Sequence, residues 1–223
     1  MPIATTLAAS VLASSFAGVA APATSSIPPM AVNVTVAANV SPALVTRLLA
    51  ETDAVWRASG FTFVWRMTPR ELVPHESVSE AGPYMPTRLH VVIGNDTGAA
   101  QGDRIQLGWI VFDGEHTPEQ QIYLSYENAQ RYLAASRDVV GLIANMPTIQ
   151  RHTLMGRVMG RALAHELGHY LLASKVHTRR GLMQAARTAY DFFSINRDGF
   201  DIDSAQRLAI ASRWQGGSLV VSR

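Results

Sequence analysis

Two histidines four residues apart, His165 and His169, most restrict how this chain can fold. Residues spaced by four lie on one face of an α-helix, one turn apart, so both imidazoles can reach the same metal ion. The sequence therefore needs a helix here, and we expect one over about residues 148–172. Glu166 is turned about 100° around the helix axis from His165. From there it is poorly placed as a ligand but can reach a water molecule beside the metal.

The pattern H-E-x-x-H at these positions is typical of a hydrolytic zinc site. Zn²⁺ binds imidazole nitrogens at about 2.0–2.1 Å and lowers the pKa of its water, whose proton a nearby carboxylate can take. We assign His165 and His169 as ligands of one Zn²⁺ per chain and Glu166 as the general base. Because Gly168 costs about 1 kcal/mol relative to alanine inside a helix, we expect a close packing partner there. The alternative is a helix whose histidines and glutamate have no chemical role.

A third ligand is needed, since zinc in hydrolytic sites usually has three protein ligands and one open position. We expect the helix to end near residues 173–175, and His177 is the next imidazole along the chain. We assign it as the third ligand, with Asp191 as the best substitute. No glutamate follows Glu166, which excludes a site completed by a downstream glutamate.

The run from His165 to His177, followed by Gly181-Leu182-Met183, resembles the metzincin clan of zinc metallopeptidases. That clan combines HExxHxxGxxH with a tight turn that places a methionine beneath the zinc. The resemblance implies that Met183 is this methionine and that Tyr190 donates a hydrogen bond to the oxyanion.

The sequence departs from the clan pattern at two points. Leu172 stands at the position of the clan's glycine, and seven residues instead of five separate His169 from the third histidine. We therefore expect Ala173 and Ser174 to build the bend in a different way.

The expected elements follow an order that also matches the clan. Strands are predicted at residues 30–40, 61–67, 88–94, 106–112 and 121–126, and helices at 42–60, 148–172 and 203–214. Residues 203–206 form a capping box at the start of the last helix, which we expect to stop before Gly216. We predict the α+β class: a single metzincin-like zincin domain with a twisted, mixed but mostly parallel sheet of about five strands, an active-site helix and a C-terminal helix. The resemblance implies that an extended substrate pairs with the edge strand at Gly108, Trp109 and Ile110.

Residues 1–21 are apolar and end in small residues, so we predict a signal peptide, then a short linker over 22–29 and the peptidase domain over 30–223. No lysine or arginine precedes Arg47, so the basic n-region of a signal is missing, and an Ala/Ser/Thr-rich disordered tail is the alternative. We expect a secreted or periplasmic protein without stable membrane insertion. The chain has no cysteine, which excludes disulfides and a thiol nucleophile.

The prediction for function is a zinc-dependent metalloendopeptidase that acts as a monomer on peptide or protein substrates. The net charge is only +2 and the arginines are scattered along the sequence, so no nucleic-acid partner is expected. Two alternatives stay open: a non-peptidase zinc amidohydrolase, and a binding protein with a vestigial zinc site. Glu166 argues against the second, because a structural site gains nothing from a base.

Overall fold

Five strands form one sheet in the computed structural model, which describes residues 27–68, 88–98 and 105–217. The strands are β1 (Met30–Val36), β2 (Phe63–Met67), β3 (His90–Gly94), β4 (Gly108–Asp113) and β5 (Thr117–Ser125). Their order across the sheet is β2-β1-β3-β5-β4. All neighbouring pairs are parallel except β4 and β5, which are antiparallel, so β4 forms an edge that runs against the rest.

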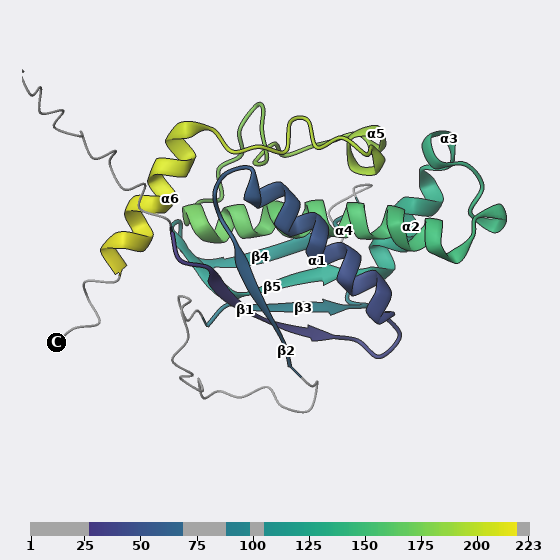
Figure 1. Ribbon diagram of the computed structural model, residues 1–223, viewed down its shortest axis with the longest axis horizontal. Helices are drawn as coiled ribbons and strands as arrows, with labels where there is room; N and C mark the ends of the chain where they lie inside the picture. The colour runs from purple at the N-terminus through teal and green to yellow at the C-terminus, as the bar shows by residue number, and fades with distance from the viewer. Residues whose placement is uncertain (1–26, 69–87, 99–104, 218–223) are drawn as a thin grey trace, which may run out of the picture.

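Two long helices, α1 (Pro42–Arg57) and α4 (Thr148–Leu172), lie side by side and pack on this sheet (Figure 1). The shorter helices are α2 (Tyr126–Ala135), α3 (Arg137–Val140), the 3₁₀ turn η1 (Ile143–Asn145), α5 (Ala189–Phe193) and the C-terminal α6 (Ser204–Gly217). The α+β class and the five-stranded, mostly parallel sheet that the sequence predicts are confirmed. Among the described residues, no helix has the length and apolar character needed to cross a membrane.

Small residues on α4 allow α1 to approach it closely. A Cβ atom at Gly160 would lie 2.6 Å from the Leu48 carbonyl oxygen, and one at Gly156 would lie 2.8 Å from the Arg47 Cβ. At this short separation the helices also exchange hydrogen bonds: Thr52 Oγ1 donates to the Gly160 carbonyl at 3.0 Å.

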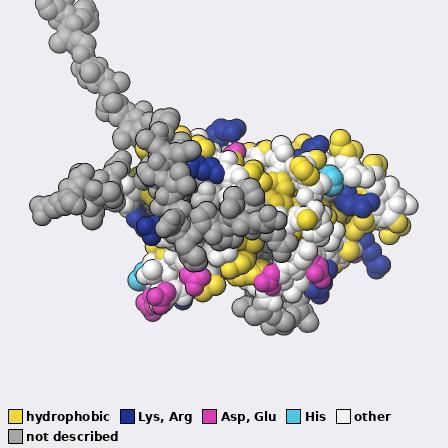
Figure 2. All heavy atoms as spheres, turned by 90° about the horizontal axis from the view of Figure 1, so that it is seen from below, with side chains coloured by type: hydrophobic (Ala, Val, Ile, Leu, Met, Phe, Trp, Pro, Cys, Tyr) yellow, Lys and Arg dark blue, Asp and Glu magenta, His cyan; other side chains and the backbone are white. Residues whose placement is uncertain are grey.

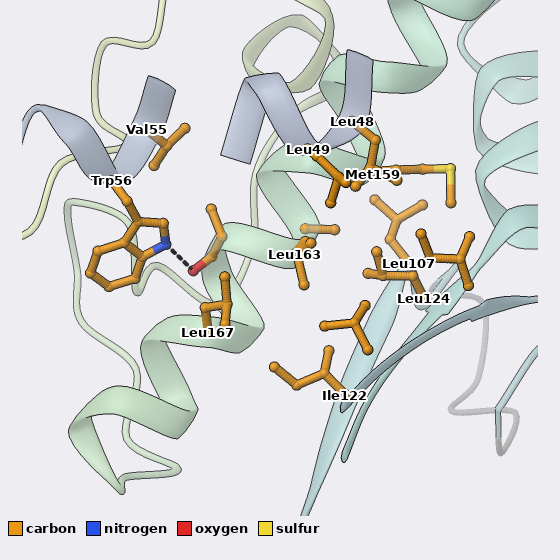
Figure 3. Packing of buried hydrophobic residues seen from close by; sticks show 14 of the residues in the cluster. Leu48, Leu49, Val55, Trp56, Leu107, Ile122, Leu124, Met159, Leu163 and Leu167 are labelled. Carbon is orange, nitrogen blue, oxygen red and sulfur yellow. Dashed lines mark hydrogen bonds between the residues drawn. The ribbon is translucent and has the colours of Figure 1, made fainter. Parts of the chain in front are cut away.

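Trp56 Nε1 adds a second bond, to the Ala164 carbonyl at 3.2 Å (Figure 3). Helix α4, which carries the two spaced histidines, is therefore held by hydrogen bonds to its backbone carbonyls as well as by side-chain packing.

The core lies between the two helices and the sheet (Figure 3). Leu48 and Trp56 of α1, Leu163 and Leu167 of α4, and Ile122 of β5 have no exposed surface. Burying a side chain of this kind contributes about 1.5–3 kcal/mol each. One face of α4 therefore packs in the core, and the histidines lie on a different face of the helix.

Several sequence-based predictions of element bounds were wrong. The C-terminal helix does not stop before Gly216 but continues to Gly217, and β5 begins at Thr117, four residues earlier than expected, because it forms a hairpin with β4. Helices α2, α3 and α5 were not predicted. The capping box of α6 is confirmed: Gln206 N–H donates to Asp203 Oδ1 at 2.7 Å, and the Gln206 side chain accepts from Asp203 N–H at 3.1 Å.

The predicted signal peptide, residues 1–21, and most of the linker lie outside the described residues. On the face of the molecule in Figure 2, the basic side chains of the described residues are scattered and form no continuous stripe.

Candidate active site

Helix α4 carries His165, Glu166 and His169 in its last two turns and ends at Leu172. The next residue, Ala173, takes the left-handed conformation with φ 48° and ψ 47°, and its N–H bonds back to the His169 and Tyr170 carbonyls. This conformation reverses the chain, as glycine does at many helix C-termini. The bend is built at Ala173 and Ser174, where the sequence places it, although neither residue is glycine.

The reversed chain brings His177 back to the two helical histidines. The side-chain nitrogens of His165, His169 and His177 available to a metal all lie within 4.8 Å of one another, the one such group found among the described residues. His165 Nε2 and His169 Nε2 are 3.1 Å apart. Two nitrogens bound to one tetrahedral zinc at the usual bond length are about 3.3 Å apart, so the spacing fits a shared ion.

The other ring nitrogens of the helical histidines are held by backbone carbonyls. His165 Nδ1 lies 2.8 Å from the Leu182 oxygen, and His169 Nδ1 lies 2.6 Å from the Ser174 oxygen. A carbonyl only accepts, so each Nδ1 carries the proton and each Nε2 keeps its lone pair for a metal.

Burial also keeps these imidazoles neutral. It lowers the pKa of His165 to about 4, and lowers the pKa of His169 and of His177 as well. The mutual repulsion of the three rings adds to this for His165 and His169. Neutral imidazole is the form that binds metals, so the donor set suits Zn²⁺ at neutral pH.

A tight turn at Gly181–Gln184 packs next to the histidines. Gln184 N–H donates to the Gly181 carbonyl at 3.2 Å, which closes the turn around Leu182 and Met183. Gly181 has φ +79°, and a Cβ there would lie 2.7 Å from the Asp201 carbonyl oxygen, so both the conformation and the space require glycine.

Met183 is fully buried, and its sulfur occupies the space that a side chain at Gly168 would need. This is the close packing partner that the sequence predicts for Gly168. The same turn therefore packs on α4 through Met183 and orients His165 through Leu182.

Glu166 lies between α4 and the edge strand β4, with only 9% of its surface exposed. The Ile110 backbone N–H donates to its carboxylate, and a Cβ at Gly108 would lie 3.3 Å from Glu166 Cγ. Burial raises the pKa of Glu166 to about 8, which the Ile110 bond opposes. The predicted base and the predicted substrate strand are thus in direct contact.

No family model matches the sequence, and no curated protein matches it. Solved structures that are similar to this chain include the following two. Archaemetzincin from Methanopyrus kandleri is 10% identical, with a TM-score of 0.48 over 84% of this chain and 96% of that one. Myroilysin is 10% identical, with a TM-score of 0.29 over 87% of this chain and 88% of that one. Likenesses this weak say nothing about activity, which has to follow from the geometry of the site.

Two further residues named from the sequence, Tyr190 and Asp191, lie on α5. Tyr190 is 70% exposed on α5, beside a shallow depression whose other lining residues are Asp191, Ser194, Asn196 and Asp198. Asp191 caps α5: its carboxylate accepts from Thr188 N–H at 2.9 Å and it is not part of the metal-ligating group. The structure does not support Asp191 as the substitute ligand, and the oxyanion role of Tyr190 stays a prediction.

The sequence interpretation missed Arg161, which lies one turn before His165 and has no exposed surface. Its Nε donates to Glu51 Oε1 at 2.8 Å, and its Nη2 donates to the Ser194 and Asn196 carbonyls, both at 2.8 Å. Nη1 bonds to the Asp191 carbonyl. Through these hydrogen bonds, Arg161 holds the segment that follows the Gly181–Gln184 turn against α4. The one signal in the sequence that could have identified Arg161 was the position of an arginine on the apolar side of the helix predicted over residues 148–172.

Lys175, the single lysine of the chain, lies in the loop between His169 and His177. Its ammonium lies 5.4 Å from the centroid of the Phe112 ring on β4, and Phe112 packs edge-on against His169 with centroids 6.4 Å apart. The end of β4 is therefore tied to the loop between the second and third histidines.

Proposed function

We propose that this chain is a zinc-dependent endopeptidase. The observation that carries the proposal is the direct contact between Glu166 and the edge strand β4, one residue from a group of three histidines whose nitrogens converge. A metal site, a base and an unpaired strand edge are the three parts that hydrolysis of an extended peptide requires. The candidates for all three lie here at the C-terminal end of α4.

His165, His169 and His177 would hold the zinc ion. When bound, Zn²⁺ acts as a Lewis acid on a carbonyl and lowers the pKa of water. The fit rests on the 3.1 Å separation of the two helical Nε2 atoms and on the carbonyl partners that leave both of them as acceptors. Three imidazoles also leave one tetrahedral position open, as a hydrolytic site needs.

Glu166 would take the proton from the attacking water and return it to the leaving amine. Its neighbour in sequence, His165, would be a ligand, so the carboxylate would lie beside the metal without binding it. In the metal-free chain, burial favours the protonated acid. A nearby cation favours the carboxylate, so we expect metal binding to convert Glu166 to the basic form. The Ile110 N–H keeps the carboxylate oriented.

The edge of β4 would bind the substrate. Within the described residues β4 pairs only with β5, so one of its edges can accept an added strand. A peptide paired along Gly108, Trp109 and Ile110 would pass next to Glu166, because Ile110 N–H bonds to its carboxylate and a Cβ at Gly108 would lie 3.3 Å from its Cγ. The exposed position of His177 is consistent with an open site rather than a closed pocket.

Export is part of the proposal and rests on the sequence of residues 1–21 alone. Expression of the full chain in a bacterial host, followed by the intact mass of the exported product, tests it. Loss of about the first 21 residues supports export by a signal peptide.

The enzymatic proposal is tested by casein cleavage with the full chain, its Glu166→Gln variant and a matched Glu115→Gln control. The Glu115 side chain is 91% exposed in the β4–β5 turn. We expect Glu166→Gln to keep its zinc and to lose a factor of about 10²–10⁴ in rate, the usual contribution of a general base, while Glu115→Gln cleaves normally. Equal cleavage by wild type and Glu166→Gln would contradict the proposal. Zinc binding without cleavage of any protein would favour the amidohydrolase alternative.

A further inference from the structure

A second concave site lies on the outer side of α1 and α4. It has a volume of about 200 Å³ and is lined by Arg47, Ala50, Glu51, Thr153, Arg157 and Arg197. We call it the arginine pocket. None of the three histidines and no part of Glu166 belongs to it, so it is separate from the candidate metal site.

The arginine pocket has more positive than negative charge. Glu51 is its one carboxylate, and it is already paired twice: with Arg161 at 2.8 Å and with Arg197 at 2.6 Å. Arg157 donates to the Phe193 carbonyl at 2.9 Å, which does not neutralise its charge. Arg47 has no ion-pair partner among the described residues. Three guanidinium groups therefore line the pocket beside a single carboxylate.

The cations are close enough to act on one another. The pKa of Arg161 is lowered by burial, and the positive charges of Arg197 and Arg157 lower it further against the effect of Glu51. An anion placed among Arg47, Arg157 and Arg197 would relieve this repulsion.

The backbone of the pocket is held in place before any ligand arrives. The Arg47 Cβ packs where a side chain at Gly156 would begin, so the start of this side chain is fixed against α4. Glu51 is buried and holds the Arg197 guanidinium. Thr153 and Arg157 lie one turn apart on the same helix. Such preorganisation reduces the entropy lost on binding.

We propose that the arginine pocket binds a phosphate group. Planar guanidinium groups match phosphate oxygens in a bidentate manner, and a dianion offsets the local excess of charge better than a single carboxylate does. The phosphate can belong to a soluble molecule or to a lipid headgroup, since both present the same oxygens to the same arginines. The proposal is independent of the peptidase activity.

Calorimetric titration of the zinc-loaded full chain with inorganic phosphate tests the proposal, beside acetate at equal ionic strength. The variants are Arg47→Gln, the double variant Arg47→Gln/Arg157→Gln and the control Arg180→Gln, an exposed arginine outside the pocket. We expect phosphate to bind more tightly than acetate, the double variant to weaken phosphate binding at least tenfold, and Arg180→Gln to have no effect. Arg47→Gln alone should weaken it severalfold, and it keeps the test decisive if the double variant folds poorly.

Phosphate could also bind at a zinc ion, and His177→Ala separates the two sites. If phosphate binding is lost in His177→Ala and kept in the arginine variants, the proposal is wrong. It is equally wrong if phosphate binds no better than acetate. Sedimentation with vesicles of phosphatidylglycerol then distinguishes the sources: arginine-dependent binding to vesicles assigns a lipid headgroup, and its absence beside arginine-dependent binding of free phosphate assigns a soluble ligand.

Discussion

The sulfur of Met183 lies in the space where a side chain at Gly168 would begin. Met183 belongs to the turn whose Leu182 carbonyl accepts from His165 Nδ1. Because residue 168 has no side chain, the turn lies directly against α4. The same turn orients His165, a ligand of the candidate metal site.

Replacing Gly168 with alanine tests this contact. Helix propensity alone favours alanine by about 1 kcal/mol, but overpacking a buried site costs about 1–3 kcal/mol. We expect a net loss of stability in urea unfolding, together with weaker zinc binding. Gly94→Ala is the control, because a Cβ at Gly94 meets no atom within 4 Å.

A double-mutant cycle locates the cause of that loss. In Met183→Ala the space opposite Gly168 opens, so adding Gly168→Ala should then cost little. A coupling energy of about 1 kcal/mol or more is expected for residues in contact. Additive effects of the two substitutions would show that the clash is not with Met183.

Ala173→Gly should stabilise the protein. Ala173 is the one non-glycine residue with positive φ in the described part of the chain, and this conformation costs an L-residue about 1–2 kcal/mol. We expect Ala173→Gly to raise the free energy of unfolding by about 1 kcal/mol with zinc affinity unchanged, and Ala173→Val to lower it. No gain from glycine would mean that the helix does not end in this conformation in solution.

The pH dependence of stability in the metal-free chain tests the burial of Glu166. Its pKa is raised from 4.5 to about 8 in the folded protein, so the folded state keeps a proton that the unfolded chain releases. This contribution is fully present below about pH 4.5 and is lost as the pH rises through about 8.

Relative to Glu166→Gln, wild type should therefore lose on the order of a few kcal/mol of unfolding free energy between pH 5.5 and 8.5. Urea titrations at both pH values, with a chelator present, measure the difference. Parallel pH profiles for wild type and Glu166→Gln would place the carboxylate in water instead.

Arg161→Met should destabilise the protein strongly. It leaves Glu51 with Arg197 as its remaining partner and frees the carbonyls after α5. Breaking a buried ion pair by removing one partner costs about 3–5 kcal/mol. Adding Glu51→Leu should restore part of this loss and not all of it, because the carbonyls stay unpaired. Full recovery in the double variant would show that the carbonyl bonds contribute nothing.

The local features of the site could be predicted from the sequence because they depend on neighbours a few positions away. Four-residue spacing puts His165 and His169 on one helical face wherever the helix lies. A glycine inside that helix indicated a close contact at position 168, and the structure shows Met183 there. The bend at Ala173 follows from the need for the helix to end before His177.

The missed features depend on contacts between distant parts of the chain. Arg161 and Glu51 are 110 positions apart, and no periodicity links them. The partner of His165 Nδ1 is the carbonyl of Leu182, a backbone atom that any residue would supply. Helix α2 was missed although Ser125 caps it by accepting from Asn128 N–H at 3.0 Å, because its ten residues directly follow a strand.

The metal content of the purified full chain tests the central claim most directly, with elemental analysis of wild type beside His177→Ala and His116→Ala. His116 is an exposed histidine in the β4–β5 turn and serves as the matched control. The geometry predicts one zinc per chain in wild type and in His116→Ala, and a strong loss of zinc in His177→Ala. If wild type binds no zinc under conditions in which it is folded, or if His177→Ala retains it fully, the three-histidine site is wrong.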